Sequence, residues 1–183
     1  MSLLSSIQPD QMRRVTIAQG DSVASRDLDL IYTTVLGSCV AVCLHDSAAR
    51  VGGINHFLLA DPAPINGESG QLLNRYGIHA MELLINEMIK RGAARERLRA
   101  RVYGGGSMRQ GLGDIGTQNI AFARRFLANE GIPILGEDVG GTSARRVEFM
   151  PAYGRARCKS IQGMVAEQQP VPVSAPCGDV ELF

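Results

Sequence analysis

The sequence has no tryptophan, and aromatic residues make up only 5% of its 183 residues. Proteins that bind single-stranded nucleic acid stack the bases on aromatic side chains, which are scarce here. The formal net charge is +1, so the chain as a whole is not strongly attracted to nucleic acid or to an anionic membrane. Apolar runs long enough to cross a bilayer are also lacking. These absences argue against nucleic acid as a partner and against insertion into a membrane.

The first residues lack the apolar stretch of a secretory signal peptide, because Ser, Gln, Asp and Arg appear early in residues 1–14. We therefore expect a cytoplasmic protein. Disulfide scaffolds are denser in cysteine and shorter, and the cytosol would keep these thiols reduced. The four cysteines are Cys39, Cys43, Cys158 and Cys177.

Hydrophobic residues make up 45% of the chain and charged residues 20%, which is the balance of an ordinary globular protein. The length suits one compact domain, which we place at residues 14–163 after a short N-terminal extension at residues 1–13. The tail at residues 164–183 contains three prolines and no hydrophobic periodicity, which predicts a flexible segment.

Residues 76–91 and 118–129 each place apolar side chains three or four residues apart, which predicts two amphipathic helices. Asn74 is the expected N-cap of the first helix and Thr117 that of the second. Residues 61–70, with two prolines and two glycines, predict a surface loop. Short apolar-rich runs separated by Gly, Asp and Asn predict strands at residues 14–18, 40–44, 51–59, 98–103, 132–135, 145–150 and 157–161. Together these elements predict an α+β fold, with a sheet core and both helices on one side.

The segment Leu36-Gly37-Ser38-Cys39 places a cysteine directly after a turn of small residues. Glycine lets a substrate approach the backbone closely, so the Cys39 sulfur is a candidate nucleophile. The backbone N–H groups of Ser38 and Cys39 are candidate donors to the oxyanion that forms when a carbonyl is attacked. The alternative interpretation is that Cys39 is a small buried hydrophobic residue.

His56 lies in an apolar run, four residues after Gly52. A free thiol has a pKa of about 8.5, so only a few per cent is thiolate at neutral pH. A neighbouring histidine raises that fraction and supplies a proton to the leaving group. An oxygen of Thr33 or Thr34 could fix the tautomer of the imidazole. The alternative is a core histidine without a chemical role.

Two further patterns have simpler interpretations. Cys39 and Cys43 with a nearby His45 suggest a zinc site, but on an extended strand the two cysteines would be about 13 Å apart, too far to share one ion. The run of glycines at residues 104–106 lacks the lysine of a phosphate-binding loop. It indicates a turn, which could also line the rim of an active site.

Longer segments of the sequence are more specific indicators of a protein family. TTVLGSCVAVCLHD and VGGINHFLLAD closely resemble the chemoreceptor glutamine deamidase family, CheD. The similarity continues through RYGIHAMELLINEMIKRGA, RVYGGGSM and IGTQNIAFARRFLANEGIPILGEDVGGTSARRVEF to GRARCKSI, and so covers nearly all of residues 15–161. There is one departure, since Ala60 stands where the family often has proline.

This resemblance implies specific residue roles. The family's nucleophile follows the Leu-Gly-Ser step, which assigns it to Cys39 rather than Cys43. The catalytic histidine of the Gly-x-x-x-His-x-x-Leu pattern falls on His56, and the third catalytic residue, six positions before the cysteine, falls on Thr33. The implied fold is a three-layer α/β/β sandwich, similar to the deamidase domain of the cytotoxic necrotising factor toxins. The implied reaction converts a receptor glutamine to glutamate through a thioester and requires no metal or organic cofactor.

The implied partners are the cytoplasmic helical regions of methyl-accepting chemoreceptors, with the chemotaxis phosphatase CheC as a further candidate. Four arginines within residues 95–101 indicate a solvated face or a docking surface for an acidic receptor. Two other functions stay open on the residues alone. One is a non-catalytic adaptor that binds receptors or CheC, and the other is a different Cys-His acyl hydrolase or acyltransferase, such as a cysteine peptidase.

Overall fold

The computed structural model describes residues 12–59, 69–107 and 115–161, which form two β-sheets, two long helices and two short 3-10 helices. The strands are β1 (Arg13–Thr16), β2 (Ser22–Ser25), β3 (Leu30–Leu36), β4 (Val40–Asp46), β5 (Val51–Phe57), β6 (Arg99–Gly104), β7 (Ile134–Val139), β8 (Ala144–Met150) and β9 (Arg155–Ile161). The helices are α1 (Ser69–Lys90), α2 (Ile115–Asn129), η2 (Arg95–Arg97) and η3 (Pro151–Tyr153).

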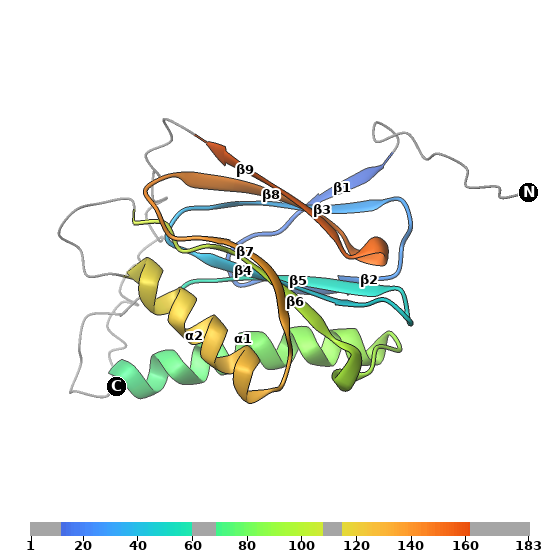
Figure 1. Ribbon diagram of the computed structural model, residues 1–183, viewed down its shortest axis with the longest axis horizontal. Coiled ribbons are helices and arrows are strands. Elements are labelled where there is room, and N and C mark those ends of the chain that lie inside the picture. Colours follow the sequence, from blue (N-terminus) through green and yellow to red (C-terminus); the bar gives the residue numbers. More distant parts are fainter. Residues whose placement is uncertain (1–11, 60–68, 108–114, 162–183) are drawn as a thin grey trace, which may run out of the picture.

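These elements are stacked in layers (Figure 1). Both long helices cover one face of the five-stranded sheet, whose strand order is β2-β5-β4-β6-β7. The four-stranded sheet, with the order β1-β3-β8-β9, covers the other face. The predicted α+β fold with both helices on one side is therefore confirmed.

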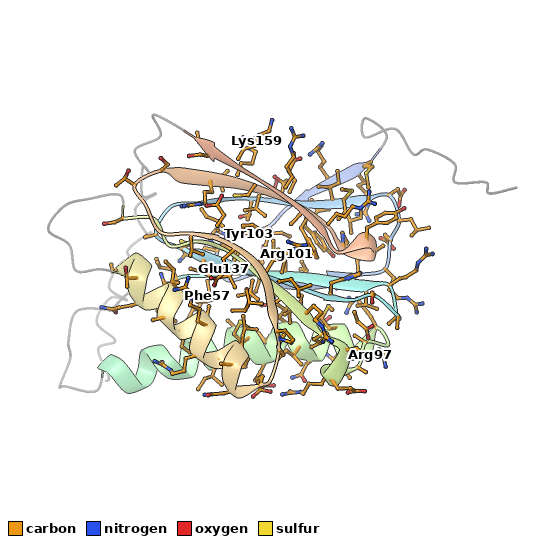
Figure 2. All side chains as sticks on the ribbon, viewed as in Figure 1. Phe57, Arg97, Arg101, Tyr103, Glu137 and Lys159 are labelled. Carbon is orange, nitrogen blue, oxygen red and sulfur yellow. The ribbon has the colours of Figure 1, made fainter. Side chains whose placement is uncertain are left out.

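The five-stranded sheet is buried on both faces because the side chains of its central strands alternate between two cores. Val40 and Val42 of β4 pack against the helices, whereas Ala41 faces the other sheet. In Figure 2, Phe57 lies toward the helices and Tyr103 lies between the sheets, in agreement with the cores to which they belong. A side chain on the face opposite the helices is therefore enclosed between the two sheets.

Gly52 and Gly53 of β5 let two elements approach this strand from opposite faces. A Cβ atom at Gly53 would lie 2.8 Å from Leu84 Cδ1 and 2.9 Å from Met88 Sδ, both on α1. A Cβ atom at Gly52 would overlap the backbone of Pro151 in η3. The two glycines thus allow close packing around the strand that carries the predicted catalytic histidine.

The structure corrects both predicted helix starts. Helix α1 begins at Ser69, so Asn74 lies inside the helix and is not its N-cap. Helix α2 begins at Ile115 and includes Thr117. In α1, Ser69 and Gly70 give no apolar signal, although the backbone there is already helical.

Several strand predictions also change. Strands β2 and β3 were not predicted, and β7 begins two residues later than expected. The reason for the shift of β7 is that the Ile132 N–H donates to the Leu127 carbonyl at 2.9 Å, so this residue completes the end of α2. The predicted loop at residues 61–70 lies outside the described residues except for the first turn of α1, and so does the predicted tail at residues 164–183.

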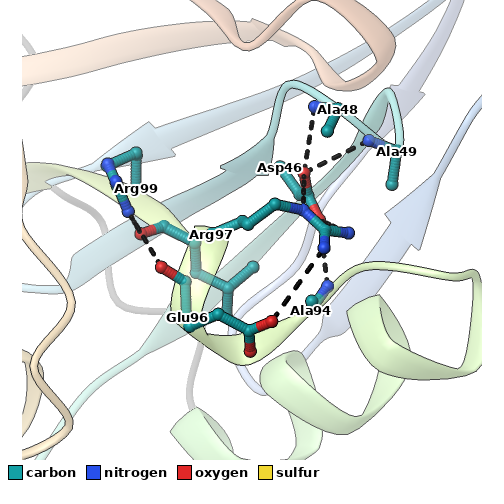
Figure 3. A network of polar contacts seen from close by, with 8 residues as sticks. Asp46, Ala48, Ala49, Ala94, Glu96, Arg97 and Arg99 are labelled. Atoms are coloured by element: carbon teal, nitrogen blue, oxygen red, sulfur yellow. Dashed lines mark hydrogen bonds and ion pairs between the residues drawn. The ribbon is translucent and has the colours of Figure 1, made fainter.

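The buried carboxylate of Asp46, at the end of β4, joins the β4–β5 turn to the segment before β6 (Figure 3). It accepts hydrogen bonds from the backbone N–H groups of Ala48 at 3.0 Å, Ala49 at 3.2 Å and Ala94 at 2.9 Å. The guanidinium of Arg97 binds the same carboxylate at 2.7 Å. Burial raises the pKa of Asp46, but the hydrogen bonds outweigh burial and hold the pKa at about 2.

We expect Asp46→Asn to destabilise the protein by about 2 kcal/mol at neutral pH, because the low pKa means that folding favours the ionised carboxyl. The pKa is lowered from 3.8, so this stabilisation is present above pH 3.8 and is lost as the pH falls toward about 2. Urea unfolding at about pH 7 and about pH 3 measures the free energy of unfolding of wild type and variant. The difference between the two proteins should be smaller at the acidic pH. Asp29→Asn, at an exposed aspartate, is the control. The same difference in unfolding free energy at both pH values would contradict stabilisation by the ionised Asp46 carboxyl.

Two of the four arginines within residues 95–101, Arg95 and Arg97, form ion pairs with carboxylates of this chain. Arg99 and Arg101 form no ion pair with the residues that the structure describes. The docking surface for an acidic receptor stays a prediction, now confined to Arg99 and Arg101.

Candidate active site

Gly37, Ser38 and Cys39 form the tight connection from β3 to β4. Its backbone carbonyls are held by the glycine run that follows β6. The Gly37 carbonyl accepts a hydrogen bond from the Gly106 N–H at 2.7 Å, and the Cys39 carbonyl accepts one from the Gly105 N–H at 2.7 Å. The glycine run therefore lies against the cysteine turn and fixes its backbone.

Asn119 of α2 supports the same turn and was not identified from the sequence. Its side chain is fully buried, and its Nδ2 donates to the Ser38 carbonyl at 2.8 Å. Its Oδ1 accepts a hydrogen bond from the Leu59 N–H at 2.8 Å, just after β5. Asn119 thus ties the cysteine turn to the strand that carries His56. The available signal was a polar residue on the apolar face of a predicted helix.

The bonded carbonyls determine where the N–H groups of the turn point. A trans peptide directs its C=O and N–H in opposite directions, so the N–H groups of Ser38 and Cys39 point away from the glycine run and α2. The Cys39 N–H lies close to its own sulfur, where it stabilises the thiolate and opposes the rise of the thiol pKa. These two N–H groups are the predicted oxyanion donors.

His56 lies in β5 opposite Ala41 of β4 and is 7% exposed. Its Nδ1 lies 3.0 Å from Thr34 Oγ1 and 3.5 Å from the Ile17 carbonyl oxygen. Thr34 Oγ1 donates to the same carbonyl at 2.8 Å. A hydroxyl has only one hydrogen, so toward Nδ1 the Thr34 oxygen is an acceptor. The neutral imidazole therefore carries its proton on Nδ1.

The other ring nitrogen of His56, Nε2, is buried and has no hydrogen-bond partner in the part of the chain that the structure describes. Burial lowers the pKa of His56, and the Ile17 carbonyl and Asp21 oppose this effect only in part. The imidazole is thus neutral at neutral pH, with the lone pair of Nε2 available to accept a proton. A buried polar atom without a partner is uncommon, and His45 Nε2 is the other one among the described side chains.

The structure brings Thr34, and not Thr33, to the imidazole. Side chains alternate along β3, and Thr34 is 2% exposed between the sheets, whereas Thr33 points to the opposite face. Within the described ranges no hydrogen bond joins Thr33 to His56. The threonine that the resemblance implied therefore lies one residue before the threonine that contacts the histidine.

The Cys39 side chain is partly exposed, and its Sγ donates to Oε1 of Gln19 at 3.4 Å. Burial raises the pKa of the Cys39 thiol to about 11. Cys43 is 2% exposed between the sheets, and burial raises its thiol pKa as well. Of these two cysteines, only Cys39 is open to a substrate.

Cys39 and His56 lie on the same face of the five-stranded sheet. Ala41 pairs with His56, and Cys39, two residues earlier, continues on the same side. Diagonal neighbours of this kind have Cα atoms about 7–8 Å apart. Among the described residues no hydrogen bond joins the sulfur to the imidazole, because the sulfur is bound to Gln19 instead. The fold makes the two predicted residues neighbours without joining their side chains.

A separate cavity of about 140 Å³ opens near the other end of β4. Its lining includes Cys43, His45 and Arg101, and it does not include Cys39 or His56. Across residues 12–59, 69–107 and 115–161, no three His, Cys, Asp or Glu side chains are grouped as metal ligands.

The family model described as CheD chemotactic sensory transduction matches residues 58–160. A relative from Zymomonas mobilis subsp. mobilis is 48% identical over 177 residues, which cover 97% of this chain and 96% of the relative. The chain belongs to the CheD family. A second CheD, from Caulobacter sp. (strain K31), is 49% identical over 93% of each chain. Both relatives are named probable chemoreceptor glutamine deamidase CheD.

The resemblance to the CheD family in the sequence is thereby confirmed. Among solved structures, the hypothetical protein YfiH of Bacillus licheniformis aligns with 64% of this CheD-family chain and 50% of its own, with a TM-score of 0.42 and 16% identity. None of the helices in the described segments has the length and apolar character needed to span a membrane.

Proposed function

We propose that this CheD-family protein deamidates glutamine side chains of chemoreceptors, with Cys39 as nucleophile and His56 as base. Relatives at up to 49% identity over most of the chain are named for this reaction. The observation that carries the chemistry is the neutral His56 imidazole, which lies next to Cys39 on one sheet face and has no hydrogen-bond partner at Nε2 among the described residues. Such a group accepts the proton of a thiol nucleophile.

The Cys39 thiol requires a base of this kind. With a pKa of about 11, only about 10⁻⁴ of it is thiolate at pH 7. Transfer of the proton to His56 during the attack generates the thiolate at the moment it reacts. Rotation of the Cys39 side chain from Gln19 toward β5 supplies the contact that this transfer needs.

In the proposed reaction, the Cys39 sulfur attacks the carboxamide carbon of a receptor glutamine while His56 Nε2 takes the thiol proton. The N–H groups of Ser38 and Cys39 hold the oxyanion. His56 returns the proton to the leaving nitrogen, and ammonia departs as the C–N bond breaks. Water, deprotonated by His56, then attacks the thioester, the C–S bond breaks, and the thiol and a glutamate side chain are released. Every step uses groups of the chain and water.

We further propose that the deamidation takes place in the cytoplasm, on the helical region of methyl-accepting chemoreceptors. CheC is a candidate partner. We also propose that the fold is the α/β/β sandwich of the cytotoxic necrotising factor deamidase domain. The support for this relation is the order of the layers, from the helices through the five-stranded sheet to the four-stranded sheet (Figure 1).

Mass spectrometry of a purified receptor cytoplasmic fragment tests the function. After incubation with the wild-type protein, a receptor peptide should gain the small mass that distinguishes glutamate from glutamine. Protein whose thiols were alkylated beforehand is the inactive control. A non-catalytic adaptor would bind the fragment without any mass gain, and a cysteine peptidase would cut it. Either of these results contradicts the proposal.

Thr34→Val should lower the deamidation rate about tenfold, because it removes the hydroxyl that holds Nδ1–H of His56. Thr33→Val makes the same chemical change one residue earlier, on the opposite face of β3, and should leave the rate unchanged. Initial rates on the receptor fragment measure both variants. If Thr33→Val loses activity and Thr34→Val keeps it, the assignment implied by the family resemblance is right and the proposed role of Thr34 is wrong.

A further inference from the structure

The turn that joins β1 to β2 is clamped to the backbone of His56. The Ala18 carbonyl accepts a hydrogen bond from the Asp21 N–H at 3.1 Å, and Gly20 has a φ of +96°, as the third residue of a type II turn requires. The Gly20 N–H donates to the His56 carbonyl at 2.7 Å, and the His56 N–H donates to the Asp21 carbonyl at 3.0 Å. The turn therefore fixes the backbone of Gln19 beside the active site, while Gln19 itself is exposed to solvent.

The side chain of Gln19 places a carboxamide directly on the sulfur. Its Oε1 accepts the hydrogen bond from Cys39 Sγ at 3.4 Å, while none of the described residues bonds to Nε2 of His56. The carboxamide of Gln19 is the same functional group as that of the proposed substrate. The resting site is thus occupied by an amide from its own chain.

We propose that Gln19 caps the resting thiol by filling the subsite of the substrate carboxamide, so that a substrate glutamine must displace it. This inference rests on the proposed function, because it takes Cys39 as the nucleophile. When the substrate amide replaces Gln19, the sulfur is free to turn toward His56. Because the cap belongs to the same chain, it competes with every substrate at a high effective concentration. A loosely bound amide does not displace it, whereas a glutamine presented on a docked receptor does.

The contact with Gln19 is unreactive for a physical reason. The thiol proton is directed at Oε1, and no proton passes to His56 Nε2, so the sulfur stays a neutral thiol. The thiolate is the nucleophile of cysteine, and a neutral thiol attacks an amide poorly. Gln19 therefore remains glutamine although it lies on the nucleophile.

The rate at which iodoacetamide alkylates Cys39 in the full chain, followed by mass spectrometry of the Cys39 peptide, tests the cap. Gln19→Ala removes the side chain, and Gln19→Met keeps its length without the carboxamide. Gln118→Ala, at an exposed glutamine of α2, is the matched control. Both Gln19 variants should react about three- to tenfold faster than wild type, the effect of one lost hydrogen bond, and the control should not change.

The receptor assay adds a second readout. Gln19→Ala should lower KM for the receptor fragment and leave kcat unchanged, because it removes a competitor of the substrate and no group that takes part in the reaction. Equal KM values in wild type and variant would overturn the proposal. So would a Gln19→Met variant that is alkylated as slowly as wild type, since the side chain would then act by bulk alone.

Two outcomes separate this inference from the proposed function. Alkylation requires no receptor, so unchanged alkylation of the Gln19 variants with normal receptor deamidation overturns the cap alone. Faster alkylation without any receptor deamidation supports the contact and overturns the function. A wild-type peptide that contains glutamate at position 19, absent from Cys39→Ala, would show that Gln19 is itself a substrate and would also overturn the cap.

Discussion

Cys39→Ala should abolish measurable deamidation, with a fall in rate of about 10⁴-fold or more. The substitution removes the atom that forms the thioester. The oxyanion donors of the turn and the imidazole of His56 remain, but neither can bond to the substrate carbon in place of sulfur. The time course of the mass gain in a receptor peptide measures the effect.

The other described cysteines are the controls for this result. Cys158→Ala, which changes another partly exposed cysteine, should keep the wild-type rate. Cys43→Ala leaves a cavity in the core between the sheets, so it should lower the thermal stability and keep the rate below the melting temperature. An active Cys39→Ala beside an inactive Cys43→Ala would mean that the nucleophile is misassigned.

Cys39 and His56 became candidates in the sequence because each follows a local pattern, a small-residue turn before the cysteine and two glycines before the histidine, and the resemblance to the CheD family implied their roles. Their proximity has a different origin. It follows from the register of β4 and β5, in which Ala41 pairs with His56. Register depends on which residues find a core on each face, and a single sequence specifies this only through the completed fold.

The choice between Thr33 and Thr34 also depends on strand register, which the sequence alone does not specify. Adjacent residues of a strand point to opposite faces, so a shift of one position exchanges a core residue for an outer one. The strand itself, β3, was not predicted, and its orientation could not be inferred. In the structure, the pairing of β3 with β8 fixes the orientation of both side chains. Thr34 is opposite Val147, and Thr33 is opposite Glu148.

Gln19 and Asn119 were not identified from the sequence because their contacts are with distant partners. Gln19 contacts a sulfur 20 positions away, and Asn119 contacts a carbonyl 81 positions away. Neither residue belongs to a local motif, and each has an ordinary interpretation in the sequence, as a turn residue and a helix residue. The candidate pair Cys39 and His56 could therefore be proposed from the sequence, whereas the contacts of Gln19 and Asn119 with the cysteine turn required the three-dimensional arrangement.

His56→Ala should lower the deamidation rate by about 10²- to 10⁴-fold at neutral pH, which is the usual contribution of a general base. The thiol pKa of about 11 leaves too little thiolate for the sulfur to react without help. Initial rates on the receptor fragment measure the loss. His79→Ala, at an exposed histidine of α1, is the control and should keep the wild-type rate.

The pH dependence separates a base from a merely structural histidine. Burial lowers the pKa of His56 below its ordinary 6.5, so the neutral base persists as the pH falls through 6.5 and the wild-type rate should decline only in more acidic solution. In His56→Ala the thiolate forms only by direct ionisation, so the rate should rise steadily with pH toward the thiol pKa of about 11. If the variant kept the acid limb of wild type, another group would be the base. If it lost rate equally at every pH, His56 would support the fold of the site and carry no proton.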